Sequence, residues 1–152
     1  MTQRMRMPAA TDAFHDVIQF VHVLASEANL ADDLAHRLRL ATDELVTNVL
    51  THGYATAPGE LELEGAVDPD RVWIRIVDTA LPFDPTLVPD PPDLDRPLSE
   101  RAPGGLGLFL ARTAVDDMSY RRCRGRNITT ITVRREVPDL DPSEPRQQPR
   151  PG

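Results

Sequence analysis

Lysine is absent from this chain, and all 17 of its basic residues are arginine. A P-loop nucleotide site needs a lysine that reaches the β- and γ-phosphates, and a protein kinase of the common type needs a lysine on its third strand. Neither kind of site is expected here in its ordinary form. Codon usage in a GC-rich genome is the simplest explanation of the arginine bias itself.

Cysteine is almost absent as well, because Cys123 is the one cysteine of the chain. No disulfide can form within the chain, and a cysteine-based metal site is not expected. No run of apolar residues approaches the 18 that a membrane-spanning helix needs. Residues 1–7 also lack the apolar stretch of a signal peptide. These absences predict a cytoplasmic protein without a membrane partner.

The charge balance is acidic, with a formal net charge of −7. Nucleic-acid-binding surfaces are normally basic, so nucleic acid is not an expected partner. Four of the arginines still gather in residues 121–126 and form a local basic patch.

The length of 152 residues and the hydrophobic fraction of 40% suit one domain with a real core. Apolar residues at helical spacing predict helices, and alternating or apolar runs predict strands. The expected order is an edge strand at 4–7, helices at 12–27 and 32–53, strands at 60–67 and 72–77, a helix at 106–118, and strands at 119–123 and 128–134 joined by a turn at 125–127. This order predicts an α/β two-layer sandwich, with a mostly antiparallel sheet and helices on one face.

Two segments do not fit regular structure. Residues 84–105 hold six prolines, which excludes a helix interior or a central strand. A long loop of this kind inside a compact domain is typical of a lid or a binding loop. Residues 138–152 are rich in proline and polar residues, which predicts a disordered tail. The expected domain therefore spans residues 1–137.

Glu44 and Asn48 form the first candidate constellation, because residues four apart share one face of a helix. A carboxylate beside an amide oxygen suits the binding of hydrated Mg²⁺ and the orientation of a nucleophile near phosphate. A solvated helix face is the alternative interpretation of the same two residues.

Asp78 is the second candidate, because it directly follows an apolar strand. A carboxylate at a strand end can accept a hydrogen bond from the exocyclic amine of adenine, although it can also simply cap the turn. The third candidate is the glycine run of residues 104–107 at a predicted helix start. Backbone N–H groups there can approach an anion, and a plain glycine-rich turn is the alternative. A Rossmann fingerprint is not expected, since no strand precedes these glycines.

The order and spacing of the three segments carry more information than each one alone. The stretches TDELVTNVLTHGY (42–54), VDTALPFDP (77–85) and GGLGLFLAR (104–112) resemble the N, G1 and G2 boxes of the histidine-kinase-like ATPase superfamily, the Bergerat fold. The HGY ending, the PFDP sequence and the proline-rich loop resemble one branch of it, the bacterial anti-sigma-factor serine/threonine kinases. That branch binds sigma factors and phosphorylates STAS-domain antagonists.

The resemblance implies a role for each matching residue. It makes Glu44 the general base and Asn48 the Mg²⁺ ligand, while Asp78 contacts adenine. The remaining residues that it implies in ATP binding are Ala80, Arg101 near the γ-phosphate, and Gly105, Leu106 and Gly107 around the phosphates. The implied partners are a STAS-domain anti-anti-sigma protein, a sigma factor and a second copy of the chain, in a pathway that regulates transcription.

One residue departs from the family pattern. The second box usually reads D-x-G, and Ala80 stands at the glycine position. A Cβ there is expected to crowd the nucleotide or to restrict the backbone. The alternative function is therefore a weakly catalytic or non-catalytic ATP-binding module that sequesters a sigma factor or a STAS partner. An ATPase or a histidine-kinase catalytic domain is a third possibility, without a dimerisation and phosphoacceptor helix pair to support it.

Overall fold

The structure, a computed structural model, describes residues 2–10, 12–54, 59–89 and 106–135. In chain order the elements are β1 (Thr2–Pro8), α1 (Ala13–Glu27), α2 (Asp32–Asn48), η1 (Val49–Gly53), β2 (Glu60–Val67), β3 (Arg71–Asp78), η2 (Pro85–Leu87), α3 (Leu106–Ala114), β4 (Asp117–Cys123) and β5 (Arg126–Arg134). The five strands form one antiparallel sheet in the order β1-β2-β3-β5-β4. The predicted α/β two-layer sandwich is confirmed.

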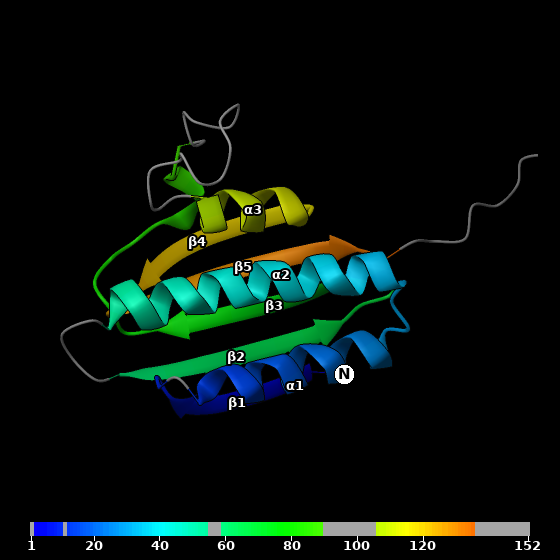
Figure 1. Cartoon of the computed structure of the whole chain (residues 1–152), viewed down its shortest axis with the longest axis horizontal. Helices are drawn as coiled ribbons and strands as arrows, with labels where there is room; N and C mark the ends of the chain where they lie inside the picture. Colours follow the sequence, from blue (N-terminus) through cyan, green and yellow to red (C-terminus); the bar gives the residue numbers. More distant parts are fainter. Residues whose placement is uncertain (1, 11, 55–58, 90–105, 136–152) are drawn as a thin grey trace, which may run out of the picture.

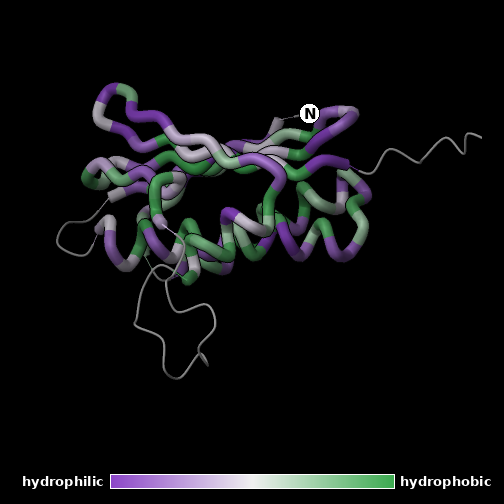
Figure 2. Tube along the Cα trace, turned by 90° about the horizontal axis from the view of Figure 1, so that it is seen from above, coloured by the Kyte–Doolittle hydropathy of each residue, from purple (hydrophilic) through white to green (hydrophobic). Residues whose placement is uncertain are grey.

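The three helices cover one face of this sheet (Figure 1). Figure 2, seen from above, separates the helical layer from the sheet layer. Alternation along each strand supplies the inner face of the core, as in Leu61 and Leu63 of β2 and Ile74 and Ile76 of β3, all of which are buried. Leu24 of α1 and Leu38 of α2 close the core from the helical side.

The outer face of the sheet carries charges in cross-strand register. Glu62 and Glu64 of β2 lie opposite Arg6 and Arg4 of β1, and ion pairs of 3.5 Å join Arg6 to Glu62 and Arg4 to Glu64. The predicted half-exposed strand is thereby confirmed. No helix of the described residues is long and apolar enough to cross a membrane.

Two predicted boundaries are wrong. The helix α3 ends at Ala114, not at Met118, because the backbone N–H of Asp116 donates to the carbonyl of Thr132 and starts the pairing with β5. The hairpin turn lies at Arg124 and Gly125, both with positive φ, so Asn127 belongs to β5 and not to the turn. The predicted tail and most of the proline-rich loop lie outside the described residues.

Helix α2 ends in a single π-helical turn, η1, which brings Val49, His52 and Gly53 to the same side as the end of β3. Tyr54 follows and fixes this arrangement. Its hydroxyl donates to the carbonyl of Glu60 at 2.8 Å and accepts from the N–H of Thr79 at 2.7 Å. The HGY sequence therefore ties the end of α2 to β2 and to the residue after β3.

Gly65 gives a test of how tightly α1 packs on the sheet. A Cβ at this position of β2 would lie 2.9 Å from Leu24 Cδ2 and 3.2 Å from Phe20 Cε1. We predict that Gly65→Ala lowers the free energy of unfolding by about 1–3 kcal/mol, measured by urea denaturation. In a Leu24→Ala background the additional cost should be smaller, because the overlapping atom is gone. An equal cost in both backgrounds would contradict this packing.

Candidate functional site

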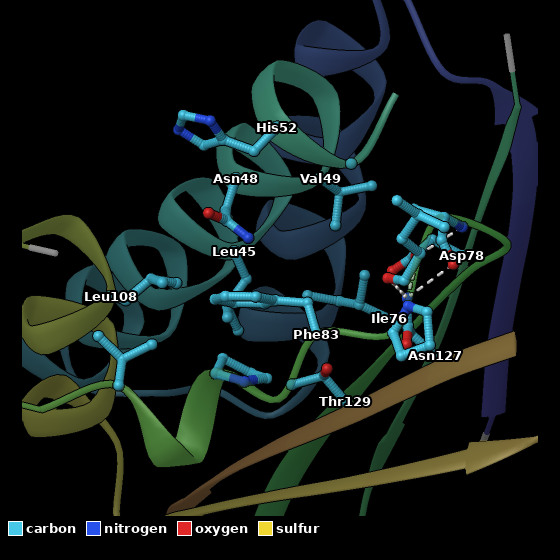
Figure 3. Close-up of a pocket in the computed structure, with 16 residues that line it drawn as sticks. Leu45, Asn48, Val49, His52, Ile76, Asp78, Phe83, Leu108, Asn127 and Thr129 are labelled. Carbon is cyan, nitrogen blue, oxygen red and sulfur yellow. Dashed lines mark hydrogen bonds between the residues drawn. The ribbon is translucent and has the colours of Figure 1, made fainter. Parts of the chain in front are cut away.

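A cavity of about 430 Å³ opens between the end of α2, the strands β3 and β5, and the segment that follows β3. Figure 3 shows its lining. Most of the wall is apolar, with Leu45, Val49, Ile76 and Leu108 among the lining side chains, and the polar groups are few. This composition and volume are typical of a small-molecule site. Phe83 extends across the cavity toward Leu45 (Figure 3).

Asp78 supplies the buried charge of the cavity. It is the last residue of β3 and is 5% exposed. Its Oδ1 accepts hydrogen bonds from the N–H of Ala80 at 3.0 Å and from Asn127 Nδ2 at 2.8 Å. Burial raises the pKa of the Asp78 carboxyl, while the bonds from Asn127 and Ala80 and the charge of Arg122 oppose that rise. The carboxylate is therefore held in place by donors on one of its two oxygens.

Asn48 and Glu44 lie one helical turn apart on α2, as predicted. Asn48 lines the cavity, and Glu44 lies beside it over the first turn of α3. A Cβ on Gly107 would overlap Glu44 Oε2, so the carboxylate rests directly against the glycine backbone. The fold thus brings the first and third motifs together at the beginning of α3.

The structure places Leu106 and Gly107 as the first two residues of α3. Arg101 and Gly105 lie outside the described residues. No group of three or more His, Cys, Asp or Glu side chains in the described part of the chain is arranged to hold a metal ion. A Mg²⁺ ion here would need phosphate oxygens and water to complete its ligands, as Mg²⁺ commonly does.

Ala80 packs in a position that the sequence did not indicate. It is buried, and a Cβ on Gly53 would lie 3.0 Å from the Ala80 Cβ. The methyl group therefore faces the end of η1. Ala80 is not among the described residues with positive φ, so its backbone adopts a conformation that does not require glycine.

Sequence reasoning missed Asn127, Thr129 and Phe83, which all line the cavity. Asn127 and Thr129 come from β5, the neighbour of β3 in the sheet. The only sequence signal for them is the position of the strand, since neither belongs to a motif. The π-helical turn adds His52 to the lining.

Comparisons with known proteins agree with this geometry. The sequence model of the histidine kinase-like ATPase domain matches residues 7–134. Serine-protein kinase RsbW of Bacillus cereus is 26% identical over 141 residues, which cover 90% of this chain and 88% of that protein. Serine/threonine-protein kinase BtrW of Bordetella bronchiseptica is 28% identical over 132 residues, which cover 86% of this chain and 92% of that protein.

A solved structure shows the same fold. The RsbU and RsbW domains of a Mycobacterium tuberculosis protein match with a TM-score of 0.63 and 19% identity, over 91% of this chain and 33% of that one. This solved structure confirms the fold, and the sequence model of the histidine kinase-like ATPase domain confirms the superfamily that the three motifs indicated. The named relatives agree with the kinase branch.

The burial of Asp78 predicts a pH-dependent stability. Because the folded-state pKa is raised above the ordinary value of 3.8, the protonated carboxyl favours the fold. That contribution is complete below about pH 4 and is lost as the pH rises through the raised pKa. Asp78→Asn cannot ionise, so it does not lose this stability as the pH rises. Its side-chain oxygen can still accept from the N–H of Ala80 and from Asn127 Nδ2. We predict that the melting temperature of wild type, relative to Asp78→Asn, falls as the pH rises from about 4.

Thermal melts between about pH 3.5 and pH 7 measure this difference. Asp43, whose pKa burial also raises, is present in both proteins and cancels. Asp70→Asn, at an exposed turn between β2 and β3, is the matched control. The prediction would be contradicted if the melting-temperature difference between wild type and Asp78→Asn changed with pH in the same way as that between wild type and Asp70→Asn.

Proposed function

We propose that this chain, which belongs to the histidine kinase-like ATPase family, binds Mg·ATP in the cavity and phosphorylates a serine or threonine of a STAS-domain partner protein. The observation that supports this most directly is the buried Asp78 carboxylate in a mostly apolar wall, with Asn48 and Glu44 between it and the start of α3. The relatives named serine-protein kinases support the choice of reaction.

Each end of the cavity has its own task in this proposal. At the β3 end, Asp78 accepts a hydrogen bond from the exocyclic amine of adenine, and the apolar wall contacts the base. At the α3 end, the backbone N–H groups around Gly107 face the phosphates, where the helix dipole favours negative charge. Asn48 is the protein ligand for Mg²⁺, which offsets phosphate charge when it is bound.

The reaction itself needs one proton acceptor. The hydroxyl oxygen of the partner's serine or threonine attacks the γ-phosphorus, the bond to the bridging oxygen of ADP breaks, and the hydroxyl proton passes to the Glu44 carboxylate. The Glu44 carboxylate contacts Gly107 at the α3 end of the site, which supports this role. Positioning and charge neutralisation then supply most of the rate, as is usual for phosphoryl transfer.

The proposed role of Glu44 is tested by Glu44→Gln, which keeps the size of the side chain and removes its basicity. We expect transfer of radiolabelled phosphate to a STAS protein to fall by at least about a hundredfold. The ATP affinity measured by calorimetry should stay the same or rise slightly, since a carboxylate near a triphosphate repels it. Glu27→Gln, at the exposed end of α1, is the control.

The outcomes separate the two functions considered. Equal transfer by wild type and Glu44→Gln would remove Glu44 as the base. A wild type that binds ATP and a STAS protein without any transfer would favour the ATP-binding module that sequesters its partner.

Gly107→Ala tests whether the placement of Glu44 matters. The added Cβ must displace the Glu44 carboxylate, so we expect a lower maximal transfer rate. In the Glu44→Gln background the same substitution should lower the maximal rate little further, because both changes act on one proton acceptor. Fully additive losses in the maximal rate would contradict the contact as the reason for the glycine.

A further inference from the structure

Asn127 is a buried amide at the adenine end of the proposed site, and it belongs to none of the three sequence motifs. It is 4% exposed and lies in β5 directly opposite Asp78 in the register of the sheet. The two residues are 49 positions apart in the chain. A buried side-chain amide must find partners for all its polar atoms, or its burial is costly.

The carboxamide of Asn127 uses its full hydrogen-bonding capacity. Nδ2 donates to Asp78 Oδ1 at 2.8 Å and to the carbonyl oxygens of Leu81 at 3.0 Å and Ala80 at 3.3 Å. Oδ1 accepts from the hydroxyl of Tyr120 at 2.6 Å and from Arg122 Nη1 at 2.9 Å. A flipped amide would direct an oxygen at a carboxylate and two carbonyls, so the network fixes the amide in one orientation.

This orientation determines which oxygen of Asp78 is available. Oδ1 is occupied by Asn127 and by the N–H of Ala80. Within the described residues, Oδ2 has no hydrogen-bond donor. With its two donors on the same oxygen, the carboxylate cannot rotate without losing both bonds. One acceptor therefore remains for a ligand in the cavity.

The same amide holds the backbone that follows β3. The carbonyls of Ala80 and Leu81 lie outside any strand and need donors. Asn127 supplies both, and Arg122 Nη1 adds a second donor to Ala80 at 2.8 Å. The segment that lacks the usual glycine of its box is thus fastened at two successive carbonyls.

We propose that Asn127 is the positioning residue that makes this cavity selective for a 6-aminopurine. It acts through Asp78: by occupying Oδ1 and anchoring residues 80 and 81, it leaves Oδ2 as a fixed acceptor for the exocyclic amine. A purine with a carbonyl at C6 presents an oxygen to that acceptor and is rejected. The inference rests on the proposed binding of ATP.

Asn127→Ala and a comparison of two nucleotides test the selectivity. ATP and inosine triphosphate differ at C6, where the amine of one is a carbonyl in the other. We expect Asn127→Ala to weaken ATP binding about tenfold or more, as for the loss of a hydrogen bond to a charged group. Binding of inosine triphosphate should change little, so the preference for ATP shrinks. A merely structural role for Asn127 would weaken both nucleotides alike.

Asn127→Asp adds a pH signature. Two facing carboxyls cannot both ionise easily, so the pKa of one of them rises strongly. While one proton is shared, Asp78 keeps a donor and binding persists. As the pH rises, both carboxyls ionise. Their repulsion then displaces residues 80 and 81, and the ATP affinity falls. In Asn127→Ala the ATP affinity changes with pH in the opposite direction. Asp78 has lost a donor that lowered its pKa, so its carboxyl ionises, and ATP binding recovers, as the pH rises.

Other titratable and charged groups surround the pair. From the elements packed around Asp78 and Asn127 they are Arg122 and Tyr120 of β4, His52 of η1, Tyr54, Arg6 of β1, Glu60 and Glu62 of β2, and Arg126 of β5. All of them are present in wild type as well. The quantity measured is therefore the dissociation constant of each variant divided by that of wild type at the same pH.

Calorimetry between about pH 5 and pH 8 should give a ratio that rises with pH for Asn127→Asp and falls with pH for Asn127→Ala. Asn29→Asp, which makes the same charge change at an exposed position between α1 and α2, should give a ratio near one throughout. Thermal melts establish that each variant is folded at the pH of measurement.

Three results would overturn the inference. An unchanged preference for ATP over inosine triphosphate in Asn127→Ala would overturn it while the proposed function stands, and so would parallel pH ratios for the two variants. A folded wild type that binds no ATP would overturn the proposed function, and this inference with it.

Discussion

A carboxylate can lie buried at the end of β3 only where donors replace the water that it loses. Asp78 obtains two such donors on one oxygen, from the N–H of Ala80 and from Asn127. The rest of the site follows from this bond across the β3–β5 pair. It sets the direction of the remaining oxygen, it fastens the residues that leave β3, and through Ala80 it brings that segment against Gly53 at the end of α2.

Arginine performs a repeated structural task in this lysine-free chain. Arg37 donates to the carbonyl of Ala114 at the end of α3, Arg112 to the carbonyls of Thr86 and Val88, and Arg122 to that of Ala80. Each of these carbonyls lies where regular pairing has stopped. A planar guanidinium with several fixed donors suits this task better than an ammonium group does. Two residues of the irregular part of the cavity wall, Ala80 and Val88, are thus held by arginines that are distant in the sequence.

The sequence predicted the elements well where a local pattern determines them. The alternation of β2 and the helical spacing of α1 and α2 gave the layers, and the three motifs gave Glu44, Asn48 and Asp78. The predicted end of α3 was wrong because Val115 and Met118 continue the helical spacing of apolar residues. The competing hydrogen bond from Asp116 to Thr132 joins residues 16 apart, which a local pattern does not show. Asn127 was assigned to a turn because a Gly-Arg-Asn sequence favours one. Its partners are Asp78, Ala80 and Leu81, which only the register of β3 on β5 brings near it.

The two ends of the cavity differ in how firmly the protein holds them. At the β3 end, hydrogen bonds connect Asp78, its donors and the backbone of residues 80 and 81, and Asn127 takes part in almost all of them. Little reorganisation is therefore left for a bound base to induce. At the α3 end, Glu44 rests on Gly107 and accepts no hydrogen bond from the described residues, and its side chain is long enough to move. In the proposed function, rigidity at the β3 end favours selectivity, because a wrong base meets groups that cannot adjust to it. In the proposed reaction, a movable carboxylate at the α3 end suits a proton acceptor that is aligned only when the hydroxyl of the partner arrives.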